Sequence, residues 1–78
     1  MYPQTVGVIT YIKPGMPASG GQREWFARLT VRFVDDQGNT REEDFPCKAR
    51  KAADYRVGDS INLVRVLRVW HIHPSDRE

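Results

Sequence analysis

The segment EWFARLTVRFVDDQGNTREEDFPC, residues 24–47, carries the clearest structural pattern in this chain. In its first part, apolar or small side chains alternate strictly with a mixed aromatic, basic and polar set, which is typical of a β-strand with one buried face. The expected core set is Trp25, Ala27, Leu29, Val31 and Phe33, and the expected outer set is Phe26, Arg28, Thr30, Arg32 and Val34. The alternation therefore predicts a long strand at residues 24–34.

A turn at residues 35–39, DDQGN, joins this strand to a returning strand at 40–47. Gly38 and Asn39 tolerate the positive φ angles that such a turn requires. A loop of this length sets the register, and the predicted cross-strand pairs are Arg32 with Glu42, Thr30 with Asp44, Leu29 with Phe45, and Arg28 with Pro46. This register keeps the apolar side chains on one side, whereas a slip of one residue would invert them.

An earlier strand is predicted at residues 5–13, TVGVITYIK, which is rich in β-branched and aromatic types. Simple alternation places Val6, Val8 and Ile12 on one face and Ile9 and Tyr11 on the other, and Gly7 suggests a bend or bulge. The following segment PGMPASGGQR, residues 14–23, is predicted to be a loop because its prolines and glycines disfavour both ladders and helices.

The second half of the chain begins with KARKAAD at 48–54, the only segment with helix-favouring composition. A turn is expected at Val57–Asp59, followed by an apolar segment at 61–72. The apolar positions of that segment change phase near Leu63, which indicates either one long, bent strand or two strands joined abruptly. The tail SDRE is expected to be solvated.

These elements predict an all-β fold, a small antiparallel β-barrel with one short helix near 48–54. A chain of 78 residues forms one domain over 1–78 with a small core. The position of the helix between the third and fourth strands favours an OB-like barrel, and an SH3-like barrel is the alternative.

Composition narrows the cellular context. The net charge of +2 permits a nucleic-acid partner without requiring one, and Cys47 is the only cysteine, so an intramolecular disulfide is excluded. The N-terminal residues show no signal peptide, and no segment reaches the about 18 apolar residues of a membrane helix. We therefore expect a cytoplasmic protein without a membrane partner, and its small size suggests a bacterial or phage origin.

Three motifs resemble a family of small bacterial β-barrel domains without assigned function: GVIT at 7–10, VRFVDDQGNT at 31–40 and YRVGDSI at 55–61. The resemblance covers about two-thirds of the chain, and its motifs are mainly turn residues. It implies a barrel, and it assigns a functional role to no residue. Members of that family often accompany membrane helices, a feature this chain lacks.

Catalysis and metal binding receive little support from the sequence. Cys47 with His71 or His73 is the only nucleophile and base combination worth considering, and no catalytic motif surrounds it. The two histidines share a strand face but lack a third ligand motif. We expect a protein that is not an enzyme and that binds neither a metal nor a cofactor.

A single-stranded nucleic acid is the favoured ligand. Proteins that bind single strands have a basic groove with aromatic side chains on which the bases stack, and this chain has both residue types. The candidate binding residues are Tyr11, Phe26, Arg28, Arg65, Arg68 and Trp70. The competing interpretation is that Trp70 belongs to the core and that the arginines only keep the surface soluble.

Protein contact is the alternative function. The segment 61–72 carries apolar residues on both faces, and so small a core cannot cover both. An exposed apolar strand invites pairing with another chain. The sequence thus also predicts a homodimer or a partner protein bound through Leu67 and Val69, and both functions can coexist.

Overall fold

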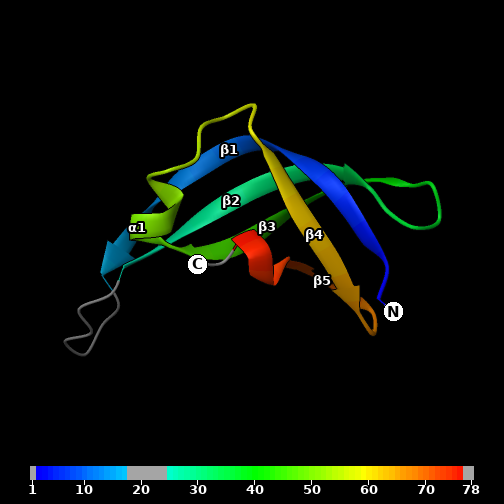
Figure 1. The fold of residues 1–78 in the computed structure, drawn as a ribbon. Helices are drawn as coiled ribbons and strands as arrows, with labels where there is room; N and C mark the ends of the chain where they lie inside the picture. The colour runs from blue at the N-terminus through cyan, green and yellow to red at the C-terminus, as the bar shows by residue number, and fades with distance from the viewer. Residues whose placement is uncertain (1, 18–24, 77–78) are drawn as a thin grey trace.

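The computed structural model describes residues 2–17 and 25–76 (Figure 1). Its elements along the chain are β1 (Gln4–Pro17), β2 (Trp25–Val34), β3 (Thr40–Lys48), α1 (Ala49–Ala52), β4 (Ser60–Val66), β5 (Val69–Ile72) and the 3₁₀-helix η1 (Pro74–Asp76). The predicted strands and the single short α-helix after the third strand are therefore present in the predicted order.

The five strands form one antiparallel sheet in the order β3-β2-β1-β4-β5. The sheet curls (Figure 1), so that its outermost strands, β3 and β5, come close enough to border one groove. The barrel is nearly closed, but within the described residues no backbone ladder joins β3 to β5. This architecture confirms the predicted small antiparallel barrel.

The β2–β3 hairpin has the predicted register. Arg32 lies opposite Glu42, Leu29 lies opposite Phe45, and Arg28 lies opposite Pro46. The Thr30 hydroxyl donates a hydrogen bond of 2.6 Å to its cross-strand neighbour, the Asp44 carboxylate. The apolar alternation and the length of the turn were therefore sufficient to fix this pairing.

The turn itself is stabilised by Asp35, whose Oδ1 accepts hydrogen bonds from the backbone N–H groups of Gln37 and Asn39, both at 2.9 Å. The hydrogen bond from Asn39 is the main reason that the pKa of Asp35 is lowered. A carboxylate that accepts two backbone donors closes the hairpin in the manner of an Asx turn.

The prediction for the two faces of β1 is wrong at one point. The pairing of β1 with β2 shifts between Ile9 and Tyr11, which makes Thr10 the extra residue of a bulge. The bulge places Ile9 in the core and packs Ile12 against it as well, while Val6 and Val8 are exposed. Simple alternation fails here because a bulge changes the phase of a strand.

β1 also extends further than predicted, and residues 14–17 belong to the strand instead of a loop. Met16 lies opposite Phe26 and Pro17 opposite Trp25, with an irregularity between Lys13 and Met16 that accommodates a proline. The rest of the predicted loop, 18–23, lies outside the described residues, as does the side chain of Trp25.

The segment 61–72 contains two strands joined abruptly, the second of the two predicted alternatives. Val66 pairs with Val69 across a two-residue turn. Leu67, the first residue of the turn, has a φ of 57°, and it is the only described residue other than glycine with positive φ. Positive φ at the first central position alone is the pattern of a type II′ hairpin.

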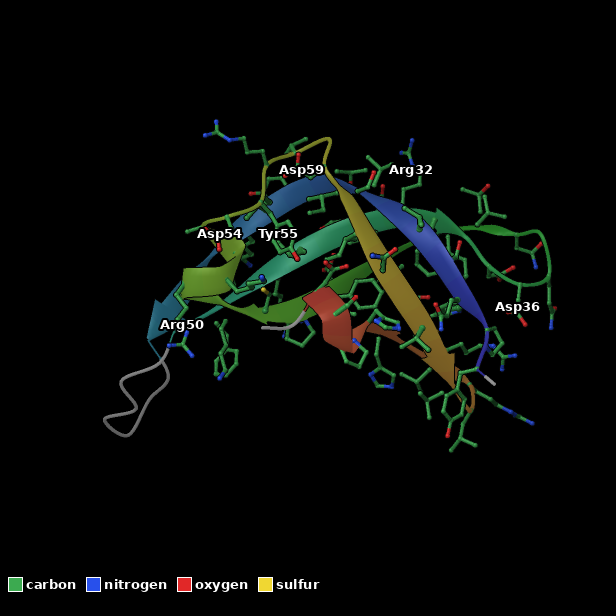
Figure 2. All side chains as sticks on the ribbon, in the orientation of Figure 1. Arg32, Asp36, Arg50, Asp54, Tyr55 and Asp59 are labelled. Atoms are coloured by element: carbon green, nitrogen blue, oxygen red, sulfur yellow. The ribbon has the colours of Figure 1, made fainter. Side chains whose placement is uncertain are left out.

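The tail is more structured than the sequence suggested. The Asp76 carboxylate of η1 accepts a hydrogen bond of 2.8 Å from the Asn62 backbone N–H. Tyr55 follows α1 and packs against the core (Figure 2). Its hydroxyl donates a hydrogen bond to the Asp76 carbonyl at 3.1 Å. These two bonds attach the end of the chain to β4 and to the segment after α1.

The core lies inside the barrel. Leu29, Val31, Phe33 and Phe45 are buried as predicted. The other core side chains are Ile9, Ala27, Cys47, Ala52, Ile61, Leu63, Trp70 and Ile72. Phe33 contacts both Phe45, at 6.2 Å between ring centroids, and Trp70, at 5.2 Å.

Candidate nucleic-acid interface

Three of the predicted nucleic-acid-binding residues lie on one outer face of β1 and β2. Phe26 and Arg28 are exposed members of β2, with buried Ala27 between them. Tyr11 lies on β1 opposite Thr30, which is two residues from Arg28 on β2 and therefore on the same face. The exposed fractions of Tyr11 and Phe26 are 57% and 47%, so both rings are accessible to a ligand.

Lys13 is a fourth member of this face, which the sequence pattern alone did not single out. It is exposed and lies directly opposite Arg28 in the β1–β2 pair. The signal in the sequence was its spacing of two residues from Tyr11, which places both side chains on the same side of a strand. We call Tyr11, Lys13, Phe26 and Arg28 the basic–aromatic patch.

The juxtaposition of Lys13 and Arg28 is electrostatically unfavourable, because like charges directly opposite each other destabilise a β-sheet. Within residues 2–17 and 25–76, no carboxylate forms an ion pair with either side chain. An anionic ligand at this position would relieve the repulsion.

The other arginines of the described strands are neutralised by carboxylates. Arg32, which projects from the barrel in Figure 2, reaches Glu42 at 3.4 Å. Arg41 pairs with Asp35 and Glu43. Among the arginines of the described strands, Arg28 therefore differs in having no ion pair with a described carboxylate.

Arg65 is also neutralised, contrary to its predicted availability. Its guanidinium reaches Asp36 of the β2–β3 turn at 2.9 Å and donates to the Leu67 carbonyl. Arg68 lies in the exposed β4–β5 turn, at the opposite end of the barrel from the C-terminal end of β1 (Figure 1). The structure therefore does not bring Arg65 or Arg68 together with the basic–aromatic patch.

Trp70 differs most from its expected role. Its side chain is only 3% exposed and its ring packs against Phe33 in the core. A base cannot stack on a ring whose faces are covered by the core, so the alternative interpretation of Trp70 as a core residue describes it correctly. Of the three predicted aromatic residues, Tyr11 and Phe26 are the two with exposed rings.

The residues proposed for protein contact are both accessible. Leu67 is 82% exposed at the tip of the β4–β5 hairpin, and Val69 at the start of β5 is 56% exposed. Exposure permits contact with a second chain, and the interface through Leu67 and Val69 stays a prediction.

Leu67→Gly is expected to stabilise the domain by about 0.5–1 kcal/mol. Positive φ costs a residue with a Cβ atom roughly 1–2 kcal/mol, and the greater freedom of glycine in the unfolded chain offsets part of the gain, about 0.4–1 kcal/mol. Thermal unfolding followed by circular dichroism should show Tm rising by about 2–8 °C. Arg68→Gly is the matched control and should lower Tm, because Arg68 does not have positive φ. A lower Tm for Leu67→Gly would show that the leucine side chain makes contacts that outweigh the strain.

A groove of about 690 Å³ lies where the barrel is not closed, between β3 and β5. Its lining residues are Phe26, Glu43, Asp44, Phe45, Pro46, Cys47, Lys48, Val69, Trp70, His71, Ile72 and Asp76.

Burial raises the pKa of the Cys47 thiol, an effect that Lys51 partly opposes. A thiol with a raised pKa is a weak nucleophile at neutral pH.

The histidines do not gather further metal ligands. Nδ1 of His73 lies 2.9 Å from the Ser75 hydroxyl and accepts from the Ser75 backbone N–H. In the part of the chain that the structure describes, no three His, Cys, Asp or Glu side chains are close enough to hold a metal ion together. Nor does any helix there have the length and apolar character needed to cross a membrane.

Comparison of the chain with protein-family models, with curated proteins and with solved structures gave no match. The resemblance to small bacterial barrel domains therefore stays a prediction, and the function has to be inferred from the residues themselves.

Proposed function

We propose that this protein is an OB-like barrel that binds single-stranded nucleic acid through the basic–aromatic patch. The observation that carries the proposal is the like-charged pair of Lys13 and Arg28, which has no carboxylate partner among the described residues and is flanked by the exposed rings of Tyr11 and Phe26. Cations beside accessible rings are what a single strand requires, since phosphates need neutralisation and bases stack on aromatic faces.

The topology is compatible with the same ligand. The sheet order β3-β2-β1-β4-β5 and a helix between β3 and β4 are compatible with an OB-fold. OB-folds bind oligonucleotides on the face of strands 2 and 3 and at the loops beside it, including the loop between strands 1 and 2. The basic–aromatic patch lies on β1 and β2, where Lys13 is opposite Arg28.

Fluorescence anisotropy with a dye-labelled oligothymidine tests the proposal. The label belongs on the nucleic acid because buried Trp70 cannot report on stacking. With two phosphate contacts, at Lys13 and Arg28, log affinity should fall against log salt with a slope of about −1.4, at roughly −0.7 per contact. Arg28→Ala should weaken binding and reduce the slope by about 0.7. Phe26→Ala should weaken binding about 5- to 150-fold, whatever the base sequence, because stacking is worth about 1–3 kcal/mol.

Arg32→Ala is the matched control, because Arg32 lies on the same strand face but is already paired with Glu42. It should leave both affinity and salt slope nearly unchanged. Affinity no tighter than millimolar at low salt, or equal losses for Arg28→Ala and Arg32→Ala, would contradict the proposal.

A further inference from the structure

The groove between β3 and β5 is bounded by two strand edges. Within residues 2–17 and 25–76, β3 pairs only with β2, and β5 pairs only with β4. The lining includes every residue of 43–48 and every residue of 69–72. If the groove lay against the face of a strand, only every second residue of that strand would line it. Because consecutive residues line it, the backbone edges of β3 and β5 form its walls.

The two edges differ in their capacity to pair with a further strand. Pro46 lies in the middle of the groove-lining part of β3 and has no N–H to donate. β5 contains no proline, so each of its residues carries a backbone donor and acceptor. Alternate residues of β5 face its free edge, and an added strand therefore meets no missing donor there.

The floor of the groove is apolar. Phe45 and Trp70 are buried there, and both contact Phe33, so side chains close the barrel where hydrogen bonds do not. The buried indole N–H of Trp70 has no acceptor among the described residues. A buried donor without a partner costs about 1–3 kcal/mol, so one groove-lining residue carries an unsatisfied polar group.

The charge of the groove selects the class of partner. Among its lining residues, Asp44 and Asp76 form an acidic rim, Glu43 is also acidic but is paired with Arg41, and Lys48 is the one lysine or arginine. Phosphates would meet repulsion from these carboxylates, whereas lysine or arginine side chains would be attracted. This charge is opposite to that of the basic–aromatic patch, so the groove fits a polypeptide and not a nucleic acid.

We propose that an extended segment of a partner protein, in which apolar and basic residues alternate, adds to the free edge of β5 in this groove. Its backbone extends the sheet, its apolar side chains point to the floor, and its basic side chains face the acidic rim; main-chain bonds supply affinity and alternate side chains supply specificity. The inference does not rest on nucleic-acid binding, although Phe26 belongs to both the groove and the basic–aromatic patch.

The probe for this site is a capped peptide that alternates valine and lysine, titrated into ¹⁵N-labelled protein and followed by NMR. The signals of the β5 amides and of the Trp70 indole N–H should shift with saturation. The same peptide with glutamate in place of lysine should bind at least tenfold more weakly. Asp44→Asn should weaken the lysine peptide by about 1.5- to 5-fold, as expected for an exposed charge pair worth about 0.2–1 kcal/mol.

N-methylated peptides distinguish strand addition from simple apolar contact. Successive N–H groups of a strand point to opposite edges, so methylating either the valine or the lysine amides blocks one edge only. One of these peptides should lose more than tenfold in affinity and the other should bind nearly as before. Equal behaviour of the two, or stronger binding of the glutamate peptide, would overturn the proposal.

Two control variants test whether binding is specific to the groove. Asp54→Asn removes an exposed carboxylate that does not line the groove, and it should leave peptide affinity unchanged. Arg28→Ala should also leave it unchanged, so failure of nucleic-acid binding does not affect this result. Sedimentation that shows a dimer with β5 amides already protected would overturn the proposal, because a second copy would then occupy the edge.

Discussion

Trp70→Ala is expected to lower the free energy of unfolding by about 3–5 kcal/mol, the usual cost of truncating a buried aromatic side chain to alanine. Trp70 is 3% exposed and packs edge to face on Phe33 of β2. Because β5 has a backbone ladder with β4 alone among the described strands, this contact attaches β5 to the far side of the barrel. A domain of 78 residues has a total stability of about 4–12 kcal/mol, so the loss removes a large part of it.

Urea unfolding followed by far-UV circular dichroism measures this loss. Val69→Ala is the matched control, since Val69 is the preceding residue of β5 and is 56% exposed. It should change stability by no more than about 0.5 kcal/mol. Trp70→Phe should fall between the two, because a smaller ring still meets Phe33. If Trp70→Ala cost no more than Val69→Ala, the aromatic contact would not be what holds β5 in place.

The β2–β3 hairpin shows what the sequence could predict. Alternation over 24–34 separated buried Leu29 and Val31 from exposed Arg28 and Arg32, and the register followed from keeping one apolar face. Both signals are local, because the two strands are joined by a short turn. The same information placed Phe26 and Arg28 correctly on the outer face.

The bulge and the second hairpin are features that local patterns could not predict. A bulge at Thr10 responds to the curvature of the sheet, which depends on all the strands together. The β4–β5 turn contains Leu67 and Arg68, with neither glycine nor asparagine to mark it. The phase change near Leu63 indicated a discontinuity but could not locate the turn.

The candidate site was predictable only in part, because the availability of a charge depends on residues distant in sequence. Arg65 is paired with Asp36, which is 29 positions away. Lys13 and Arg28 became a site only when the β1–β2 register placed them opposite each other. Sequence patterns give the direction of a side chain on its strand, and the fold decides which charge lies beside it.

Gly7→Ala is expected to destabilise the protein by about 1–3 kcal/mol, although a single methyl group is all that it adds. Gly7 is buried in β1, and a Cβ atom there would overlap Cγ1 of Val31 and lie 3.2 Å from the Arg32 carbonyl oxygen. The overlap is with a fully buried, β-branched core residue, which has few rotamers into which it can move. Where a Cβ atom fits, replacing glycine with alanine stabilises the protein by about 0.4–1 kcal/mol, because the unfolded chain loses conformational freedom. At Gly7 we expect the steric overlap to outweigh this gain, so the net effect is destabilising.

A double-mutant cycle with Val31→Ala isolates that cause. Val31→Ala removes the Cγ1 atom that the new methyl group would meet, so Gly7→Ala should cost about 1–2 kcal/mol less in the Val31→Ala background than in the wild type, within the range usual for residues in contact. Urea unfolding of the four proteins gives the coupling free energy. Additive losses would show that Gly7 is required for a reason other than the approach of β1 to Val31, and the close packing of β1 on β2 would then not explain the glycine.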